Sequence, residues 1–456
     1  MTMSEPELLH IGYGAGFAGD RPDAAIALAH DLAERPGPRY LAFELLAERT
    51  LAETQQRRLA DPEQGYAERL FDFLDPVLPI CLPAGIPIIT NGGAAHPVAA
   101  ARRLRATLER IGHGGARIAC VLGDDLQDAL DPHHPPAWLP REVPFEDIVS
   151  CHVYIGAESV TRALEEGADV VICGRIADPS MAVGAIRHAF GWSATDWQRT
   201  AIALATGHLL ECCTQVTGGY FADPGFKDVP DPAHPGCPIV ELKRSGELVV
   251  TKTAGSGGVV NARTVREQLL YEIHDPGAYL TPDGVLDLNE VTVIDHGNDR
   301  VEVTGIRGHP APDTLKGNLG LGGLWFGEAG ISYAGPNALA RARLARDILL
   351  ERSREQCPQL SPRIDLIGVC SVLGDDRGEA LEQTMAEGAT GTDVRVRLGV
   401  VDRDRAAIAR LLQEVEALYT NGPAGGGGVR KRLGESLRTS AFTIDRTLVS
   451  TTLRWF

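Results

Sequence analysis

The stretch Leu8-Leu9-His10-Ile11-Gly12-Tyr13-Gly14-Ala15-Gly16-Phe17-Ala18-Gly19 decides the fold, because an apolar run leads directly into a glycine-rich turn. The glycines follow the spacing G-x-G-x-x-G, and Glu44 ends the next apolar run, Tyr40-Leu41-Ala42-Phe43. In dinucleotide-binding proteins this spacing lets backbone amides approach a pyrophosphate at a helix N-terminus, while a carboxylate about 20 residues on holds a ribose. The stretch therefore predicts a strand, a turn and a helix, with a ligand site at the turn.

The start of the following helix argues against a dinucleotide. Asp20 is a suitable N-cap and Pro22 suits the first helical turn, so we predict that the helix begins after the third glycine. Asp20 also places a negative charge where a diphosphate would lie, unless Arg21 faces the pocket. NAD(P) binding stays an alternative, and we favour a loop that borders a cleft, with the candidate substrate-binding residues Gly14, Gly16, Gly19 and Arg21.

Length and composition predict a soluble, multidomain protein. The 456 residues suggest two or three domains, and 44% apolar with 23% charged residues is typical of globular chains. A net charge of −17 argues against nucleic acid or an anionic membrane surface as partner. Because no apolar run is long enough to span a membrane and no signal peptide is evident, we expect a cytoplasmic protein.

The cysteine pattern predicts reduced, structural thiols. Cys81, Cys120, Cys151 and Cys173 lie in or beside strand-like runs, where a thiol behaves as a small core residue. Cys212-Cys213 is an adjacent pair, which is the spacing of neither a zinc knuckle nor a C-x-x-C redox motif.

Strand-like and helical segments alternate up to about residue 215, which predicts a largely parallel sheet of Rossmann-like, doubly wound type with flanking helices. The expected strands are 8–13, 39–44, 86–90, 116–122, 149–155 and 169–173, and the expected helices are 22–34, 66–75, 97–111, 158–166 and 180–190. Residues 218–238 are rich in Gly, Pro and Asp and predict a long, functional loop. We place a domain boundary near 285, at Thr281-Pro282-Asp283-Gly284, which divides an α/β domain, 1–285, from a smaller α+β domain, 286–456.

Polar residues and glycines follow the expected strands, where a parallel sheet places its ligand. They are Glu44, Asn91 with Gly92, Asp124 with Asp125, and Arg175 with Asp178. Such residues also make turns and helix caps, which is the alternative explanation for each of these clusters. Taken together, they favour a polar cleft at one edge of the sheet.

Several of these side chains suit acid–base chemistry. Glu44 and Glu48 would share one face if the chain turned helical directly after the strand, and two close carboxylates can divide acid from base work. His208 and Glu211 are three residues apart in an expected helix, so the carboxylate could orient the imidazole for proton transfer. A hydrogen-bonded core histidine is the alternative.

Two further clusters suit charged ligands. Asp124 with Asp125 could hold a divalent metal such as Mg²⁺, or cap a helix instead. Arg175 suits a carboxylate or phosphate. Consecutive glycine amides can form an anion nest, here followed by basic residues and suited to CoA phosphates, or the segment is a flexible surface loop; its candidate residues are Gly425, Gly426, Gly427, Gly428 and Arg430.

Seven runs together resemble one known family. They are GAGFAGDR (14–21), FELLAERT (43–50), GHLLEC (207–212), GGYFADP (218–224), QLLYEIHDP (268–276), ISYAGPN (331–337) and NGPAGGGG (421–428). In order along nearly the whole chain, they resemble the acyclic terpene utilisation family, formerly described as a domain of unknown function. The family takes its name from gene clusters for the breakdown of citronellol and geraniol, which proceeds through branched acyl-CoA thioesters. The resemblance implies a role around branched carboxylates or their CoA esters. It transfers no reaction and no catalytic residue.

The combined hypothesis is an enzyme of branched-chain or terpenoid acid catabolism that acts on a carboxylate or acyl-CoA, as a lyase, hydratase or isomerase. Its candidate catalytic residues are Glu44, Asp124, Asp178, His208 and Glu211. The alternatives are an NAD(P)-dependent oxidoreductase and a non-catalytic partner subunit of an acyl-CoA enzyme. We also expect a homo-oligomer.

Overall fold

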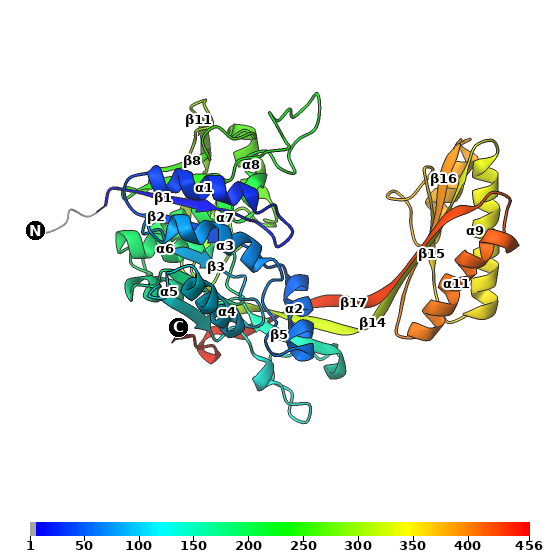
Figure 1. The fold of residues 1–456 in the computed structure, drawn as a ribbon, viewed down its shortest axis with the longest axis horizontal. Coiled ribbons are helices and arrows are strands. Elements are labelled where there is room, and N and C mark those ends of the chain that lie inside the picture. Colours follow the sequence, from blue (N-terminus) through cyan, green and yellow to red (C-terminus); the bar gives the residue numbers. More distant parts are fainter. Residues whose placement is uncertain (1–5) are drawn as a thin grey trace, which may run out of the picture. The chain divides into compact units, whose positions relative to one another are not determined.

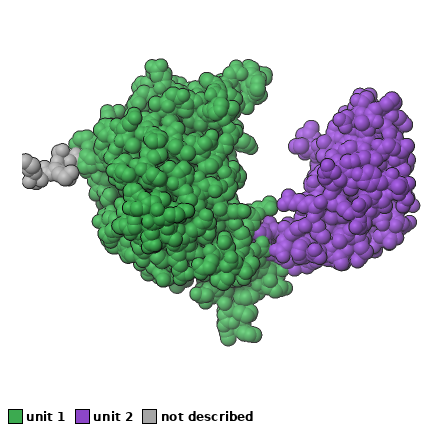
Figure 2. Space-filling view, viewed as in Figure 1, with its two compact units in different colours: residues 1–320, 439–456 green, residues 321–438 purple. Residues whose placement is uncertain are grey.

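The computed structural model describes residues 6–456, which form two compact units. The first runs to Gly320 and includes Thr439–Phe456, and the second is Leu321–Arg438, as the green and purple surfaces in Figure 2 show. The compact units therefore divide at other positions than the expected boundary near 285. Strands β11 (Thr292–Asp295) and β12 (Val301–Thr304) extend the sheet of the first unit beyond 285. At the end of the chain, β18 (Thr452–Trp455) pairs antiparallel with β4 (Ile118–Leu122) in the same sheet.

A ten-stranded mixed sheet organises the first unit, in the order β11-β12-β8-β7-β1-β2-β3-β6-β4-β18. Figure 1 labels β11, β8, β1, β2 and β3 of this sheet. The five central strands of the sheet, from β1 to β4 in this order, are parallel, as the alternation of strands and helices predicts. The strands outside them pair antiparallel, so the complete sheet is mixed. The remaining strand bounds are β1 (Leu8–Tyr13), β2 (Arg39–Phe43), β3 (Ile88–Thr90), β6 (Val170–Ile172), β7 (Pro238–Lys243) and β8 (Leu248–Lys252).

Helices cover both faces of the parallel strands. On one face, α1, α3 and α4 bury Leu28, Phe73 and Leu104 against Phe43 of β2. Side chains alternate along a strand, and the neighbouring Tyr40 points to the other face, where its hydroxyl lies 2.7 Å from His188 of α6. The helix bounds of this unit are α1 (Asp23–Glu34), α2 (Glu48–Ala60), α3 (Leu70–Cys81), α4 (Pro97–Arg110), α5 (Glu158–Glu165), α6 (Ser180–Phe190), α7 (Trp197–Glu211) and α8 (Ala262–Leu270).

Local sequence signals set several of these helix ends. Pro97 opens α4 in its first turn, and Gly191 ends α6 in the left-handed conformation, with φ of 62°. The side chain of Asp196 caps α7 by accepting from the amide of Arg199. Helix α7 carries His208 and Glu211, so its placement determines part of the site.

The second unit is α+β, as expected for this part of the chain. Strands β14 (Thr314–Ala334) and β15 (Arg363–Ile367) pair antiparallel with β16 (Asp393–Asp402), and β17 (Gly427–Asp445) completes the sheet order β15-β16-β14-β17. Buried residues of α9 (Ala338–Gln356) and α11 (Arg405–Asn421) pack in one core with β14 and β16. The other elements of the chain are α10 (Glu379–Ala386), β5 (Ile148–Val153), β9 (Tyr279–Leu280), β10 (Val285–Asp287) and β13 (Arg307–His309).

The structure also bears on the expectations about membrane spans and cysteines. Across residues 6–456, no helix is both long and apolar enough to cross a membrane. All nine cysteines are free; Cys212 is partly exposed and the others are buried, in keeping with structural thiols.

Candidate active site

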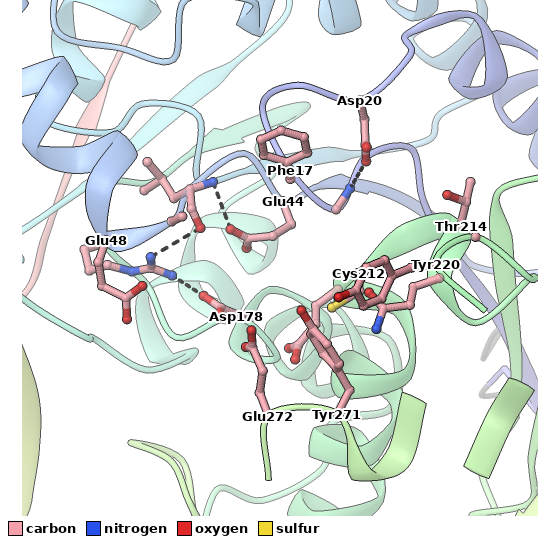
Figure 3. Close-up of a pocket in the computed structure, with 17 residues that line it drawn as sticks. Phe17, Asp20, Glu44, Glu48, Asp178, Cys212, Thr214, Tyr220, Tyr271 and Glu272 are labelled. Carbon is pink, nitrogen blue, oxygen red and sulfur yellow. Dashed lines mark hydrogen bonds and ion pairs between the residues drawn. The ribbon is translucent and has the colours of Figure 1, made fainter. Parts of the chain in front are cut away.

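A cavity of about 530 Å³ opens where the central strands end. Gly16 follows β1, Glu44 follows β2, and Arg175 and Asp178 follow β6, so part of the predicted strand-end group, namely Glu44, Arg175 and Asp178, meets here. In Figure 3, Glu44, Glu48 and Asp178 surround a space that Tyr271 and Glu272 border from below. Its remaining wall consists of Phe17, Asp20, Leu46, Ala47, Glu211, Cys212, Thr214, Gln215, Gly219 and Tyr220.

A second cavity of about 290 Å³ adjoins the first. The two share the wall residues Glu48, Asp178, Glu211, Tyr271 and Glu272. The second cavity adds His208, Tyr279 and Lys316, among others. Because one set of side chains lines both spaces, we treat them as a single site, of a size that suits a small-molecule ligand.

Glu44 is buried at the wall of this site, with 4% of its surface exposed. Its carboxylate accepts hydrogen bonds from the backbone amide of Leu46 and from the side-chain amide of Asn91. The oxygen of Asn91 in turn accepts from the amide of Leu45, which fixes the orientation of Asn91. Burial and the nearby Asp178 carboxylate raise the pKa of Glu44 well above its ordinary value of 4.5. Glu44 is therefore a candidate proton donor.

Arg175 and Asp178 form the charged floor of the cavity. Arg175 is 1% exposed; it pairs with Asp178, donates to the carbonyl oxygen of Ile176 at 2.8 Å, and lies over the Tyr154 ring at 4.3 Å. Asp178 is open to the cavity on one side but otherwise surrounded by protein, and this burial raises its pKa even though Arg175 opposes the shift. The sequence suggested Arg175 as an anion receptor, yet its guanidinium already serves a carboxylate of the chain.

Glu48 reaches the site by a different route from the one expected. The segment after β2 is not helical at Glu44, because α2 begins only at Glu48, so the two carboxylates are not neighbours on one helix face. Glu48 accepts from the Tyr154 hydroxyl at 2.6 Å and from the Lys316 ammonium at 3.2 Å. Burial acts to raise the pKa of Glu48, but these two donors outweigh it and lower the pKa to about 2. Glu48 thus stays ionised where Glu44 favours its proton.

His208 and Glu211 form a hydrogen-bonded pair on α7, as their spacing predicts. Nδ1 of His208 lies 2.8 Å from Oε1 of Glu211, and both residues are buried. Burial acts to lower the pKa of His208, but the Glu211 carboxylate outweighs it, and the pKa of His208 lies above its ordinary value. For Glu211, burial has the opposite effect and raises the pKa. Within the described chain, Nε2 of His208 and Oε2 of Glu211 have no hydrogen-bond partner. A ligand could therefore bond to either atom.

Several wall residues were not predicted from the sequence, among them Glu272, Tyr220, Tyr271 and Lys316. Glu272 and Tyr220 have left-handed backbones, with φ of 60° and 56°, which non-glycine residues seldom adopt outside functional sites. Tyr271 packs edge-on against Tyr220, and Lys316 comes from β14. The runs 218–224 and 268–276 that carry the family resemblance contain three of these four, which is the one sequence signal that could have found them.

The glycine loop borders the site without offering its amides to an anion. Helix α1 does begin after the third glycine, but its N-cap is Pro22; Asp20 instead accepts from the amide of Gly16 at 2.8 Å. Arg21 donates to the carbonyl oxygen of Ala233. A Cβ on Gly16 would lie 2.4 Å from the carbonyl carbon of Cys212, so close packing explains that glycine. Gly14 and Gly19 line a neighbouring cavity of about 550 Å³.

Asp124 lies outside the site and supports it from behind. It is buried, and its Oδ2 accepts from the backbone amide of Arg175 at 2.6 Å. Asp125 instead pairs with Arg58 at 2.9 Å, so the two aspartates serve different partners. Gly92 packs against Leu70 and does not line the site.

The other expected ligand groups are not gathered at this site. Gly425, Gly426, Gly427, Gly428 and Arg430 all belong to the second compact unit, so they are not part of this cavity wall. Across residues 6–456, no group of three or more His, Cys, Asp or Glu side chains is arranged to hold a metal ion.

The Glu44 carboxyl gives a pH-dependent prediction. Its pKa is raised on folding, so the stability that its proton provides is complete below the ordinary pKa of 4.5 and is lost as the pH rises through the folded pKa. We expect Glu44→Gln to raise the thermal midpoint at pH 8 but to change it little at pH 4.5. The lowered pKa of Glu48 has the opposite sign, so Glu48→Gln should destabilise at pH 8. A loss of stability in Glu44→Gln that is equal at both pH values would contradict the assignment.

Comparison with known proteins adds one strong match. Residues 9–455 match the sequence model of a family described as "Acyclic terpene utilisation family protein AtuA". None of the curated proteins matches the chain. Among solved structures, "De novo designed protein Foldit4" aligns with 24% of this chain and 96% of its own, at 12% identity and a TM-score of 0.17.

Proposed function

The chain belongs to the acyclic terpene utilisation family AtuA, and from this premise we propose that it is an enzyme acting by acid–base chemistry on a branched carboxylate or its acyl-CoA thioester. The observation that carries the proposal is that two buried titratable groups, Glu44 and the hydrogen-bonded His208–Glu211 pair, line the same site. Raised carboxyl pKa values are typical of general acids that work near neutral pH. Lyase, hydratase and isomerase reactions all need such groups.

The roles follow from the hydrogen bonds. Glu211 would exchange a proton with the substrate through its unpartnered oxygen, Oε2. His208 would hold the other oxygen, Oε1, and stabilise the carboxylate once Glu211 has given up its proton. Glu44, held by Asn91, would act as the second acid or base in the same cavity. Arg175 limits the charge that the carboxylates accumulate, because it neutralises Asp178. Asp124 is proposed as a positioning residue, since it holds the backbone of Arg175.

A nicotinamide-dependent reaction is less well supported. Helices on both faces of the parallel strands support a Rossmann-like, doubly wound description, which we retain as a proposal. However, Asp20 already occupies the amide of Gly16, which a pyrophosphate would need, and adds a negative charge. Titration with NAD(P) separates the two functions, since tight binding would favour the oxidoreductase.

The test of the proposal is a ligand and substrate panel on the full chain. Thermal unfolding is followed with branched acids, their CoA thioesters and NAD(P), because a ligand that binds only the folded state raises its apparent stability. The same thioesters, both saturated and α,β-unsaturated, are then incubated with the protein and analysed by mass spectrometry for water addition, elimination or isomerisation. Stabilisation and turnover by a branched thioester or acid would support the proposal. Stabilisation without turnover would favour the non-catalytic partner subunit.

A further inference from the structure

The site has an unusual balance of charge. Six carboxyl side chains line its first cavity, namely Asp20, Glu44, Glu48, Asp178, Glu211 and Glu272. The cations of the two walls are Arg175, Lys316 and, when protonated, His208. Each of these cations already bonds one of the carboxylates: Arg175 bonds Asp178, Lys316 bonds Glu48, and His208 bonds Glu211. The three cations are thus already paired with carboxyl groups, and the walls hold three more carboxyl groups, Asp20, Glu44 and Glu272. An anionic ligand would therefore meet no unpaired cation among these walls.

A second observation shows what the site can bond. Oε2 of Glu211 has no partner within residues 6–456, although the residue is only 7% exposed and lines both cavities. A carboxylate oxygen accepts an N–H or O–H donor, and a protonated one donates to a carbonyl. A neutral amide or alcohol supplies both a donor and an acceptor, and an ester or thioester supplies an acceptor. An ionised carboxylate also supplies acceptors, but the ionised acids of the wall repel its charge.

We propose that the part of the ligand that enters this site is uncharged, so that the substrate is a neutral acyl derivative, such as a thioester, rather than a free carboxylate. The inference rests on the proposed function and narrows its substrate class. Recognition then consists of hydrogen bonds from Glu211 and its neighbours to a carbonyl, hydroxyl or N–H group. The carboxyl-rich wall with its paired cations disfavours the ionised free acid.

The test uses three small probes with one carbon skeleton: 3-methylbutanoate, 3-methylbutanamide and 3-methylbutylamine. Calorimetric titration of the full chain at pH 8 should give an amide Kd at least about tenfold lower than that of the carboxylate, because only the latter carries a like charge. The amine should also bind more tightly than the carboxylate. Equal or tighter binding of the carboxylate, or no binding of any probe, would overturn the inference.

A charge variant makes the test specific to this wall. Glu272→Gln removes one negative charge from both cavities at nearly constant shape. It should lower the ratio of the carboxylate Kd to the amide Kd at least about threefold. Glu146→Gln, at an exposed position that lines neither cavity, should leave this Kd ratio unchanged. A Kd ratio that neither variant changes would overturn the inference.

The two proposals fail in different ways. If Glu211→Gln abolishes turnover but the carboxylate binds best, the charge preference is wrong and the acid–base function stands. If the amide binds best but Glu211→Gln and Glu44→Gln both retain full turnover, the charge preference stands and the acid–base function is wrong.

Discussion

Replacement of Glu211 by glutamine is expected to lower kcat by at least about 100-fold, the contribution typical of general acid–base catalysis. Glutamine keeps the size of the side chain and can still accept from Nδ1 of His208, but it cannot exchange a proton. Because burial raises the pKa of Glu211, the neutral amide should not destabilise the fold. The measurement is kcat on the best substrate of the panel, together with the thermal midpoint of each variant.

The matched control is Glu247→Gln. Glu247 forms a surface ion pair with Lys243, and such pairs contribute little to stability. Its activity should equal that of the unmodified protein. A folded Glu211→Gln variant with full kcat would remove Glu211 from the mechanism. If Glu44→Gln also retained full kcat, acid–base chemistry at this site would be excluded.

Replacement of Arg175 by methionine is the second large effect, this time on stability. Arg175 is among the largest fully buried side chains in the described part of the chain, and methionine preserves most of its volume. The substitution leaves the Asp178 carboxylate without its partner and the Ile176 carbonyl without two hydrogen bonds. Removal of one partner from a fully buried ion pair typically costs about 3–5 kcal/mol in the free energy of unfolding. Because the Asp178 side chain is 36% exposed, we expect the lower end of this range, about 3 kcal/mol.

Denaturant unfolding of Arg175→Met and of a matched surface variant measures this cost. Arg352 is 40% exposed and pairs with Glu414 on the surface of the second unit, so Arg352→Met should cost no more than about 1 kcal/mol. Arg175→Lys should recover only part of the loss, because an ammonium cannot reproduce the planar guanidinium contacts with Ile176 and the Tyr154 ring. Equal costs for Arg175→Met and Arg352→Met would show that Arg175 has no structural role.

Much of the first unit could be predicted from the sequence because its signals are local. The apolar runs before Glu44 and Arg175 form parallel strands, and their carboxyl ends bring both residues to one cavity. The three-residue spacing of His208 and Glu211 likewise predicts their contact, since it needs only one helix. Hydrophobic periodicity and turn chemistry act over a few residues, so one sequence is enough to find them.

The parts that were missed depend on contacts between distant segments. The carboxylate of Asp20 turns back to Gly16, rather than capping α1, in a loop that packs on the backbone of Cys212. Asp124 supports Arg175 from behind the cavity, although its sequence position resembles that of Glu44. In both cases the residue type allows several partners, and only packing selects one of them.

By itself, the sequence determined the family, the α/β strands and helices, and the group of polar residues at the strand ends, because each is encoded in local pattern or in long matching runs. Only the tertiary structure decided the charge of the site. It brings Glu272 and Lys316 into the cavity walls that also contain Glu48 and Glu211, and it pairs every cation of these walls with an acid. Burial and charge–charge distances, which set pKa values and ligand preference, exist only once the chain has folded.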